Sequence, residues 1–219
     1  AFPYDFQIAQ SARFTRAESS HLSRTIQSGG NTRQWSLSFW IKLTGVAGLV
    51  NSQYYIYTAR TNAQGAYDHI TMHVEDGKPY LQFFGGEVTF NAVMQDTSAW
   101  YHMLVVADTA NATATLRKRL YLNGTQIDPI SASYPSQNYE LFVNSTVSGG
   151  YTSGNIHVLG YTGGGRGLDG YIAEYHLIDG LQLTPDSFGE TKATTGQWIP
   201  IDTSGLTYGT NGFRLQFLD

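Results

Sequence analysis

The chain has 219 residues, a formal net charge of −4 and no cysteine. This length suits one large β-sandwich or two small domains, and the lack of cysteine excludes a disulfide scaffold, a thiol nucleophile and a cysteine-ligated zinc site. The sequence has no run of about five basic residues and no apolar stretch of about 18, so we expect neither nucleic-acid binding nor membrane insertion. Aromatic residues make up 14% of the chain, which also has 24 glycines, and both features favour strands and tight turns over helices.

The clearest strand pattern lies between Trp35 and Leu43. Apolar residues occupy every second position there, which indicates a half-buried strand with Ser36, Ser38 and Lys42 on its polar face. Trp40 breaks the alternation, and we expect a loop to cover it rather than a ligand to bind it.

The middle of the chain predicts a central strand followed by a hairpin. From Trp100 to Asp108 both faces are apolar, which indicates burial on both sides, so we expect His102 to be an interior residue rather than a ligand. Asn123-Gly124 suits a type I′ turn because both residues tolerate positive φ. The strands on either side are expected at Leu120–Leu122 and Thr125–Ile130.

Further strands follow toward the C-terminus. Tyr171–Ile178 alternates, so Tyr171, Ala173, Tyr175 and Leu177 should face one side and Ile172, Glu174, His176 and Ile178 the other. Phe213–Leu218 alternates as well.

Weaker strand patterns are spread over the rest of the chain. These strands are expected at Ala12–Phe14, His21–Thr25, Tyr54–Ala59, His69–Val74, Pro79–Phe84, Val88–Met94 and Asn155–Leu159. Thr184–Gly189 predicts one short helix, with Thr184 as its cap and Pro185 in its first turn. The pattern as a whole predicts an all-β, two-sheet antiparallel β-sandwich.

Four segments resemble, in order, strands of the laminin-G-like, concanavalin A-like jelly roll. They are Trp35-Ser36-Leu37-Ser38-Phe39-Trp40-Ile41-Lys42, Trp100-Tyr101-His102-Met103-Leu104-Val105-Val106, Arg119-Leu120-Tyr121-Leu122-Asn123-Gly124 and Gly170-Tyr171-Ile172-Ala173-Glu174-Tyr175-His176-Leu177. The resemblance covers about residues 10–190. It implies one jelly-roll domain over residues 1–219, with residues 190–219 as a C-terminal extension that returns to the sandwich.

The C-terminal quarter is similar to structural proteins of phages and large viruses, often of the tail-fibre type. The similar segments are Ile178-Asp179-Gly180, Leu183–Glu190, Gly196-Gln197-Trp198-Ile199-Pro200 and Tyr208–Phe213, together with Ala132–Tyr139. The resemblance implies a virion surface protein, a fibre or appendage domain that recognises host glycans or receptors. The alternative is a capsid decoration or assembly protein that binds other virion proteins. Such fibres are commonly homo-oligomers, which we expect here.

The sequence does not favour an enzyme, although the fold also hosts glucanases. Retaining glycosidases need two carboxyl groups about 5–5.5 Å apart, and no Glu-x-Asp-x-Glu strand pattern supplies such a pair. No Gly-x-Ser-x-Gly motif is present either. His69 and His73 lie four residues apart in an expected strand, about 13 Å apart and too far to share a metal ion. We therefore expect no catalytic residues, and a glycan-active hydrolase is the least favoured alternative.

Loop aromatics and amides are the predicted ligand-binding residues, because sugar binding needs ring faces and hydrogen-bonding groups. The candidates are Tyr134, Asn138, Tyr139, Tyr151, Tyr161 and Arg166, the last from a glycine-rich loop. Laminin-G-like relatives often bind Ca²⁺ at a sandwich edge. The resemblance therefore implies a calcium site, with Glu18 and Asp169 as candidate ligands.

Overall fold

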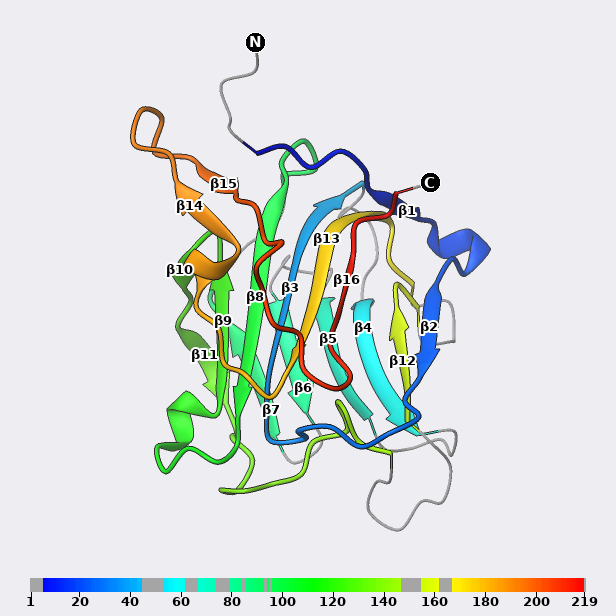
Figure 1. Ribbon diagram of the computed structural model, residues 1–219, viewed down its shortest axis with the longest axis vertical. Helices are drawn as coiled ribbons and strands as arrows, with labels where there is room; N and C mark the ends of the chain where they lie inside the picture. The colour runs from blue at the N-terminus through cyan, green and yellow to red at the C-terminus, as the bar shows by residue number, and fades with distance from the viewer. Residues whose placement is uncertain are drawn as a thin grey trace.

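The structure, a computed structural model, describes residues 6–44, 53–61, 67–73, 79–83, 86–92, 94, 96–146, 155–161 and 167–218. Within these residues two seven-stranded antiparallel sheets are stacked on one another (Figure 1). The all-β, two-sheet sandwich predicted from the sequence is confirmed.

The first sheet has its strands in the order β1, β13, β3, β8, β9 and β10, and β16 pairs with the second half of β13. Their bounds are β1 (Ala12–Phe14), β3 (Gln34–Leu43), β8 (Tyr101–Asp108), β9 (Lys118–Leu122), β10 (Thr125–Gln126), β13 (Gly170–Asp179) and β16 (Phe213–Leu215).

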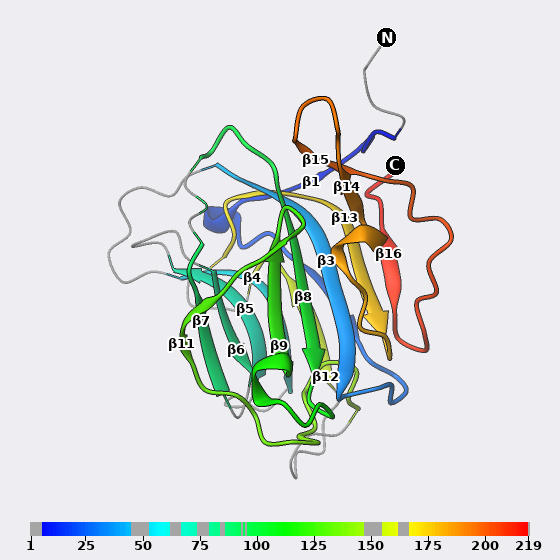
Figure 2. The same ribbon diagram turned by 90° about the vertical axis from the view of Figure 1, so that its left-hand side faces the viewer.

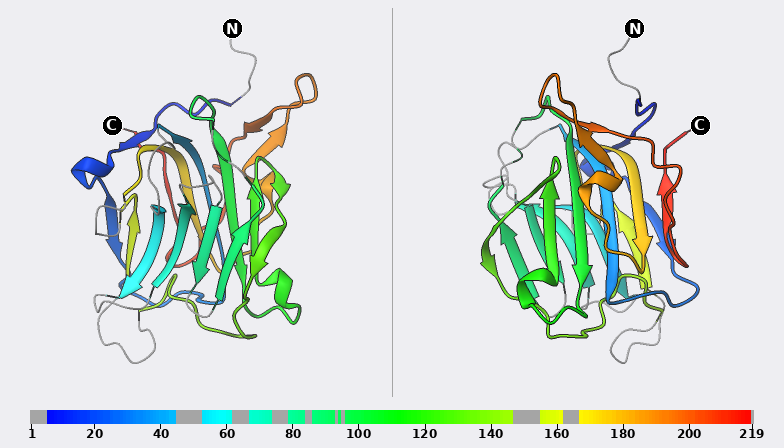
Figure 3. Two further views of the ribbon diagram at one scale, coloured as in Figure 1. Left: turned by 180° about the vertical axis from the view of Figure 1, so that it is seen from behind. Right: turned by 60° about the vertical axis from the view of Figure 1, so that its left-hand side comes forward.

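The second sheet has the order β11, β7, β6, β5, β4, β12 and β2, and it faces the viewer in the left panel of Figure 3. Its strands are β2 (Leu22–Thr25), β4 (Gln53–Thr61), β5 (Tyr67–His73), β6 (Pro79–Phe83), β7 (Gly86–Phe90), β11 (Pro129–Ala132) and β12 (Asn155–Leu159).

Among the described residues, the short elements outside the two sheets are one hairpin and three 3-10 turns. The hairpin joins β14 (Gly189–Thr191) to β15 (Trp198–Pro200) and was not predicted. The turns are η1 (Arg16–Glu18), η2 (Ala114–Leu116) and η3 (Pro185–Ser187). The helix expected at Thr184–Gly189 is therefore only the single turn η3, and the side chain of Thr184 makes no capping hydrogen bond. No helix of the described residues is long and apolar enough to cross a membrane.

The core between the sheets follows from the alternation in β3 and β8. Leu37 and Phe39 of β3 and Val105 of β8 point inward and are fully buried, in one cluster with Val88 and Phe90 of β7. Apolar burial of this kind, about 25 cal/mol for each Å² removed from water, is the main force that joins the two sheets.

The expected strand Thr125–Ile130 is two strands in different sheets. Thr125 and Gln126 pair with β9 in the first sheet, whereas Pro129–Ala132 pairs with β7 in the second. The chain therefore crosses from one sheet to the other where a single hairpin partner was predicted. Pro129 begins the new strand at the sheet edge, a position that proline tolerates because its missing N–H is not needed for pairing.

A β-bulge in β13 overturns the predicted alternation of that strand. Ala173 pairs with Trp40 and His176 with Ser38, so two residues of β13 oppose one of β3. Glu174 takes the extra position with φ 46°, a left-handed conformation that is strained for a side chain with a Cβ. Beyond the bulge each side chain of β13 points to the face opposite to the one that simple alternation from Tyr171 predicts. As a result Ile172, Tyr175 and Leu177 share the core, and Ala173 does not.

The outer face of the first sheet is covered by the chain between β13 and β16, residues 180–212, which we call the C-terminal cover. Leu104, Val106 and Ile178 of the sheet are fully buried against Phe188 and Tyr208 of this segment. In Figure 2 the orange and red chain lies on the side of the first sheet that faces away from the second.

The cover corrects the prediction that β3 is half-buried. Ser36 and Ser38, read from the sequence as solvent-facing, have exposed fractions of 0% and 1%. The hydroxyl of Ser36 donates to the carbonyl of Leu181 (2.9 Å) and accepts from the N–H of Leu183 (2.8 Å). Ser36 thus fixes the start of the cover on the sheet, and Ser38 bonds to the buried His102. Both polar side chains of this strand are therefore satisfied without facing water.

One buried carboxylate fastens both ends of the cover. The side chain of Asp179, at the end of β13, accepts hydrogen bonds from the N–H of Asn31 (2.7 Å) and of Asn211 (2.9 Å) and from the amide of Asn144 (3.1 Å). Its own N–H donates to the carbonyl of Tyr208 (2.8 Å). Three loops that are distant in sequence therefore converge on a single acidic group.

We expect Leu104→Ala to lower the free energy of unfolding by about 2–5 kcal/mol, because it leaves a cavity under the cover. Urea denaturation followed by fluorescence measures the change. Ile130→Ala, at a side chain 53% exposed on β11, is the control and should cost about 0.5 kcal/mol or less. A loss at Leu104 as small as the control's would mean that the outer face is open to water.

Candidate functional site

A groove of about 480 Å³ opens on the outer face of the first sheet, between the segment that precedes β1 and the β14–β15 hairpin. The described residues that line it are Phe6, Gln7, Ile8, Ala9, Gln10, Ser11, Trp40, Trp100, Ala173, Gln197, Trp198, Ile199 and Pro200. A volume of this size is in the usual range for small-molecule sites. The groove exists only because the cover and the N-terminal segment approach one another over the sheet.

Three of the chain's four tryptophans line this groove. Trp40 is 8% exposed and lies over the sheet, and its ring centroid is 5.2 Å from that of His102. Trp198 also stacks on His102, with ring centroids 5.9 Å apart. Trp100 is 38% exposed, so its indole is the one that a ligand meets most freely.

Two glycines allow Trp198 to lie where it does. A Cβ on Gly124 would lie 2.4 Å from the ring of Trp198, and one on Gly189 would lie 2.6 Å from it. Gly124 also has φ +81°, as the predicted Asn-Gly turn requires. The turn therefore closes the β9–β10 hairpin and leaves room for an aromatic wall.

His102 supports the aromatic cluster from the interior, the position expected from the sequence. Its Nε2 lies 2.8 Å from the hydroxyl of Ser38, and the residue is fully buried. Burial, together with the neighbouring His176, lowers the pKa of His102 to about 3, so the ring is neutral at physiological pH.

The rim of the groove carries neutral polar groups. Gln7 and Gln10 are exposed, Ser11 and Gln197 join them, and none of the described lining residues is charged. Indole faces pack against the C–H faces of a pyranose ring, while amides pair with hydroxyl groups. The arrangement suits a polar, uncharged ring system better than a metal ion or a reacting carbonyl.

A cluster of buried polar residues lies beside the groove, under the cover. Glu174 accepts from Arg214 (Nε, 2.8 Å) and lies 3.3 Å from Nε2 of His176, whose Nδ1 is 2.9 Å from the hydroxyl of Tyr208. Burial alone raises the pKa of Glu174, but the hydrogen bonds from His176 and Arg214 outweigh it and hold that pKa below its usual value. The cluster therefore fixes β16 to β13.

This cluster is not an accessible catalytic pair. Glu174 is 6% exposed and His176 is 2% exposed, beneath residues of the cover. Glu174 is the one carboxylate among the described residues that line the small cavity next to it. The two closely spaced carboxyl groups of a retaining glycosidase are not found together there.

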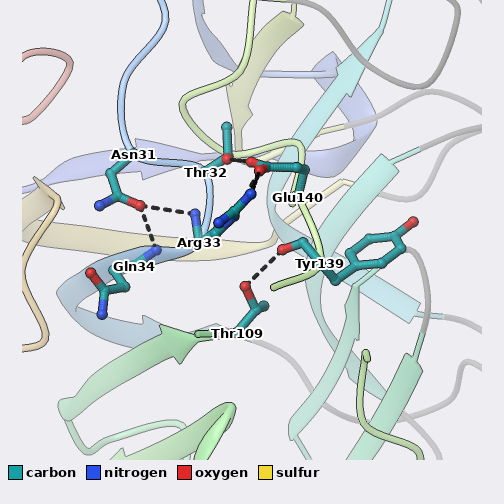
Figure 4. A network of polar contacts seen from close by, with 7 residues as sticks. All are labelled: Asn31, Thr32, Arg33, Gln34, Thr109, Tyr139 and Glu140. Atoms are coloured by element: carbon teal, nitrogen blue, oxygen red, sulfur yellow. Dashed lines mark hydrogen bonds and ion pairs between the residues drawn. The ribbon is translucent and has the colours of Figure 1, made fainter. Parts of the chain in front are cut away.

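Two predicted ligand-binding residues, Asn138 and Tyr139, lie against Thr109 near the Gln34 end of β3, and Figure 4 shows Tyr139 there. The N–H of Asn138 donates to the carbonyl of Thr109 (2.7 Å), and the hydroxyl of Thr109 donates to the carbonyl of Tyr139 (2.7 Å). Tyr134 and Tyr139 are half-buried against the core. This group is distant from the groove, which lies toward the other end of β3.

Tyr161 lies at the opposite end of the sandwich, with its ring 6.0 Å from that of His21. The structure therefore does not gather the predicted ligand-binding residues into one site. Tyr151 and Arg166 lie outside the described residues.

The two candidate calcium ligands, Glu18 and Asp169, do not form a site suited to a metal ion. One carboxylate oxygen of Asp169 accepts a hydrogen bond from the backbone N–H of Arg16 (2.8 Å), and the other lies 3.9 Å from the guanidinium of Arg16. Within the described chain no three acidic or histidine side chains, Glu18 included, come together as a metal site. The residues around Asp169 thus suit a guanidinium better than Ca²⁺, and the calcium site stays a prediction.

The sequence pattern singled out Trp40 as the exception in its strand, but it did not predict the groove. The walls come from residues 6–11 and 197–200, which are far apart in the chain and show no strand alternation. The one available signal was an aromatic residue on the polar face of a strand.

Two stacked antiparallel sheets of this kind define a jelly-roll β-sandwich. The chain belongs to the concanavalin A-like lectin/glucanases superfamily, whose Laminin_G_3 family model matches residues 17–187. A search of curated proteins gives no match.

Two solved structures share the fold. Domains LG4–5 of the mouse laminin α1 chain are 13% identical with a TM-score of 0.53, over 98% of this chain and 48% of that one. A candidate carbohydrate-binding protein from Bacteroides ovatus is 13% identical with a TM-score of 0.55, over 91% and 53%. The chain thus spans about half the length of each of these structures.

Arg214→Met is expected to cost about 3–5 kcal/mol of unfolding free energy at pH 7, because it leaves Glu174 buried without its guanidinium. The depressed pKa of Glu174 means that this stabilisation is present above the ordinary carboxyl pKa of 4.5 and is lost as the pH falls through the lower folded-state value. Urea unfolding at pH 7 and near pH 3 measures both effects.

Arg33→Met is the matched control, because Arg33 pairs with Glu140 at the surface. Its cost should stay below about 1 kcal/mol. An Arg214→Met cost that did not shrink in acid would show that the loss comes from packing rather than from the charge of Glu174.

Proposed function

We propose that this chain is a non-enzymatic carbohydrate-binding domain whose ligand lies in the three-tryptophan groove. The observation that carries the proposal is the combination of Trp40, Trp100 and Trp198 with a rim of neutral amides in one open groove. Membership of a superfamily that contains lectins supports it. So does the Bacteroides structure, which is itself a candidate carbohydrate-binding protein.

The same superfamily contains glucanases, which makes hydrolysis the alternative to test. Among the described lining residues of the groove there is no carboxylate to act as acid or nucleophile. Glu174, in the buried cluster beside the groove, already accepts a hydrogen bond from Arg214 and lies against His176. Binding without bond cleavage is therefore the function we put forward.

The setting we propose is the surface of a virus particle, with the domain as part of a fibre or appendage. Support comes from the sequence between Ile178 and Phe213, which resembles structural proteins of phages and large viruses. In the structure most of this segment forms the cover, including one wall of the groove. Peptides of the chain should be detected by mass spectrometry in purified particles, and absence from them would reject this setting.

Trp100→Ala should weaken glycan binding by about tenfold or more, because an exposed aromatic side chain at the centre of a site often carries over 1 kcal/mol. A glycan array identifies ligands, and titration calorimetry with the best one measures the loss. Leu116→Ala is the control, since Leu116 is 39% exposed on η2, almost the exposure of Trp100.

A parallel Tyr161→Ala variant tests the loop site predicted from the sequence. If Tyr161→Ala abolishes binding and Trp100→Ala does not, the glycan binds around Tyr161 rather than in the groove. If wild-type protein binds no glycan on the array, carbohydrate binding itself is rejected.

A further inference from the structure

A row of outward-facing residues crosses three strands of the first sheet next to the groove. Arg13 of β1 pairs with Tyr171 of β13, and Tyr171 pairs with Lys42 of β3. Trp100, which directly precedes β8, continues the row, and its ring centroid is 6.4 Å from that of Tyr171. We call Arg13, Tyr171 and Lys42 the cationic row.

Strand alternation places these side chains on the outer face. Phe14 and Leu43, next to Arg13 and Lys42 in the chain, belong to the core, so Arg13 and Lys42 point the opposite way. Arg13 is exposed, and Lys42 and Tyr171 are half-buried. All three are therefore accessible on the face where the groove opens.

The two cations lie on either side of one aromatic ring. Two strand spacings separate their backbones, about 10 Å. Arg13 forms no ion pair or side-chain hydrogen bond within the described chain. Lys42 forms none either, but it lies close enough to Asp96 to help lower the pKa of that carboxyl, after the hydrogen bonds from Ser98. A local excess of positive charge thus remains on a chain of net charge −4.

Trp100 connects the row to the groove. It lines the groove and also contacts Tyr171. A ligand that lies across Trp100 therefore meets uncharged amides on one side and Arg13 with Lys42 on the other.

From this juxtaposition we propose that the site selects acidic oligosaccharides: a neutral ring occupies the groove and an adjacent anionic sugar lies over Tyr171, between Arg13 and Lys42. The inference rests on the carbohydrate-binding function proposed above. The guanidinium of Arg13 matches a carboxylate with two parallel hydrogen bonds, and the ring of Tyr171 offers an apolar face to the sugar.

The test compares matched oligosaccharides that differ only in charge, namely a uronic- or sialic-acid-containing glycan, its sulfated counterpart and its neutral counterpart. Titration calorimetry with the whole chain should give the acidic glycans the higher affinity. Between about 0.1 M and about 1 M NaCl that preference should fall, as the screening length drops from about 10 Å to about 3 Å. The carboxylate and sulfate arms identify which anion Arg13 prefers.

Arg13→Gln and Lys42→Gln should each reduce affinity for the acidic glycan, by about tenfold for Arg13, and leave the neutral glycan within about twofold. Arg33→Gln removes one positive charge at the other end of the sheet and is the control for net charge. It should change neither affinity.

The outcomes separate the two proposals. Equal affinity for acidic and neutral glycans, with both lost in Trp100→Ala, overturns the selection of acidic sugars and leaves carbohydrate binding intact. A loss in Arg33→Gln equal to that in Arg13→Gln would also overturn it, because the effect would then come from net charge. Absence of binding to every glycan rejects the function itself.

Discussion

The structure depends on the burial of a second face of the first sheet. An antiparallel sheet in a sandwich commonly keeps one face in water, but here residues 180–212 pack over Leu104, Val106 and Ile178. Hydrogen bonds to Ser36 fix the start of this segment, Asp179 holds its last part through Tyr208 and Asn211, and the Glu174–Arg214 pair fixes the strand β16 that follows it. Without this contact the first sheet would have an open apolar face and no groove.

The fold could be predicted because most strands carry their own evidence in the sequence. Alternation in β3 and the doubly apolar β8 gave the centre of the first sheet, and Asn123-Gly124 gave a hairpin turn. The errors arose where a tertiary contact overrides local pattern. Ser36 and Ser38 resemble solvent-facing residues but bond to the cover and to His102, and the bulge at Glu174 changes the facing of β13 in a way that no local pattern indicates.

The candidate site was less predictable than the fold because its residues come from segments with no regular pattern. Residues 6–11 form no strand, and Trp198 reaches the groove only because Gly124 and Gly189 lack side chains. Composition drew attention to tyrosine-rich loops such as 134–139. In the structure those tyrosines are half-buried against the core, whereas three tryptophans gather elsewhere. Aromatic abundance indicated the kind of chemistry but not its location.

The groove's two walls come from opposite ends of the chain, residues 6–11 and 197–200. A ligand that touches both walls would act as a non-covalent bridge between two segments that are distant in sequence. Because a ligand stabilises only the state that binds it, occupancy would slow local opening, and with it proteolysis, of both segments together. A filled groove would thus lengthen the life of the folded domain, whatever the chemistry of the molecule that fills it.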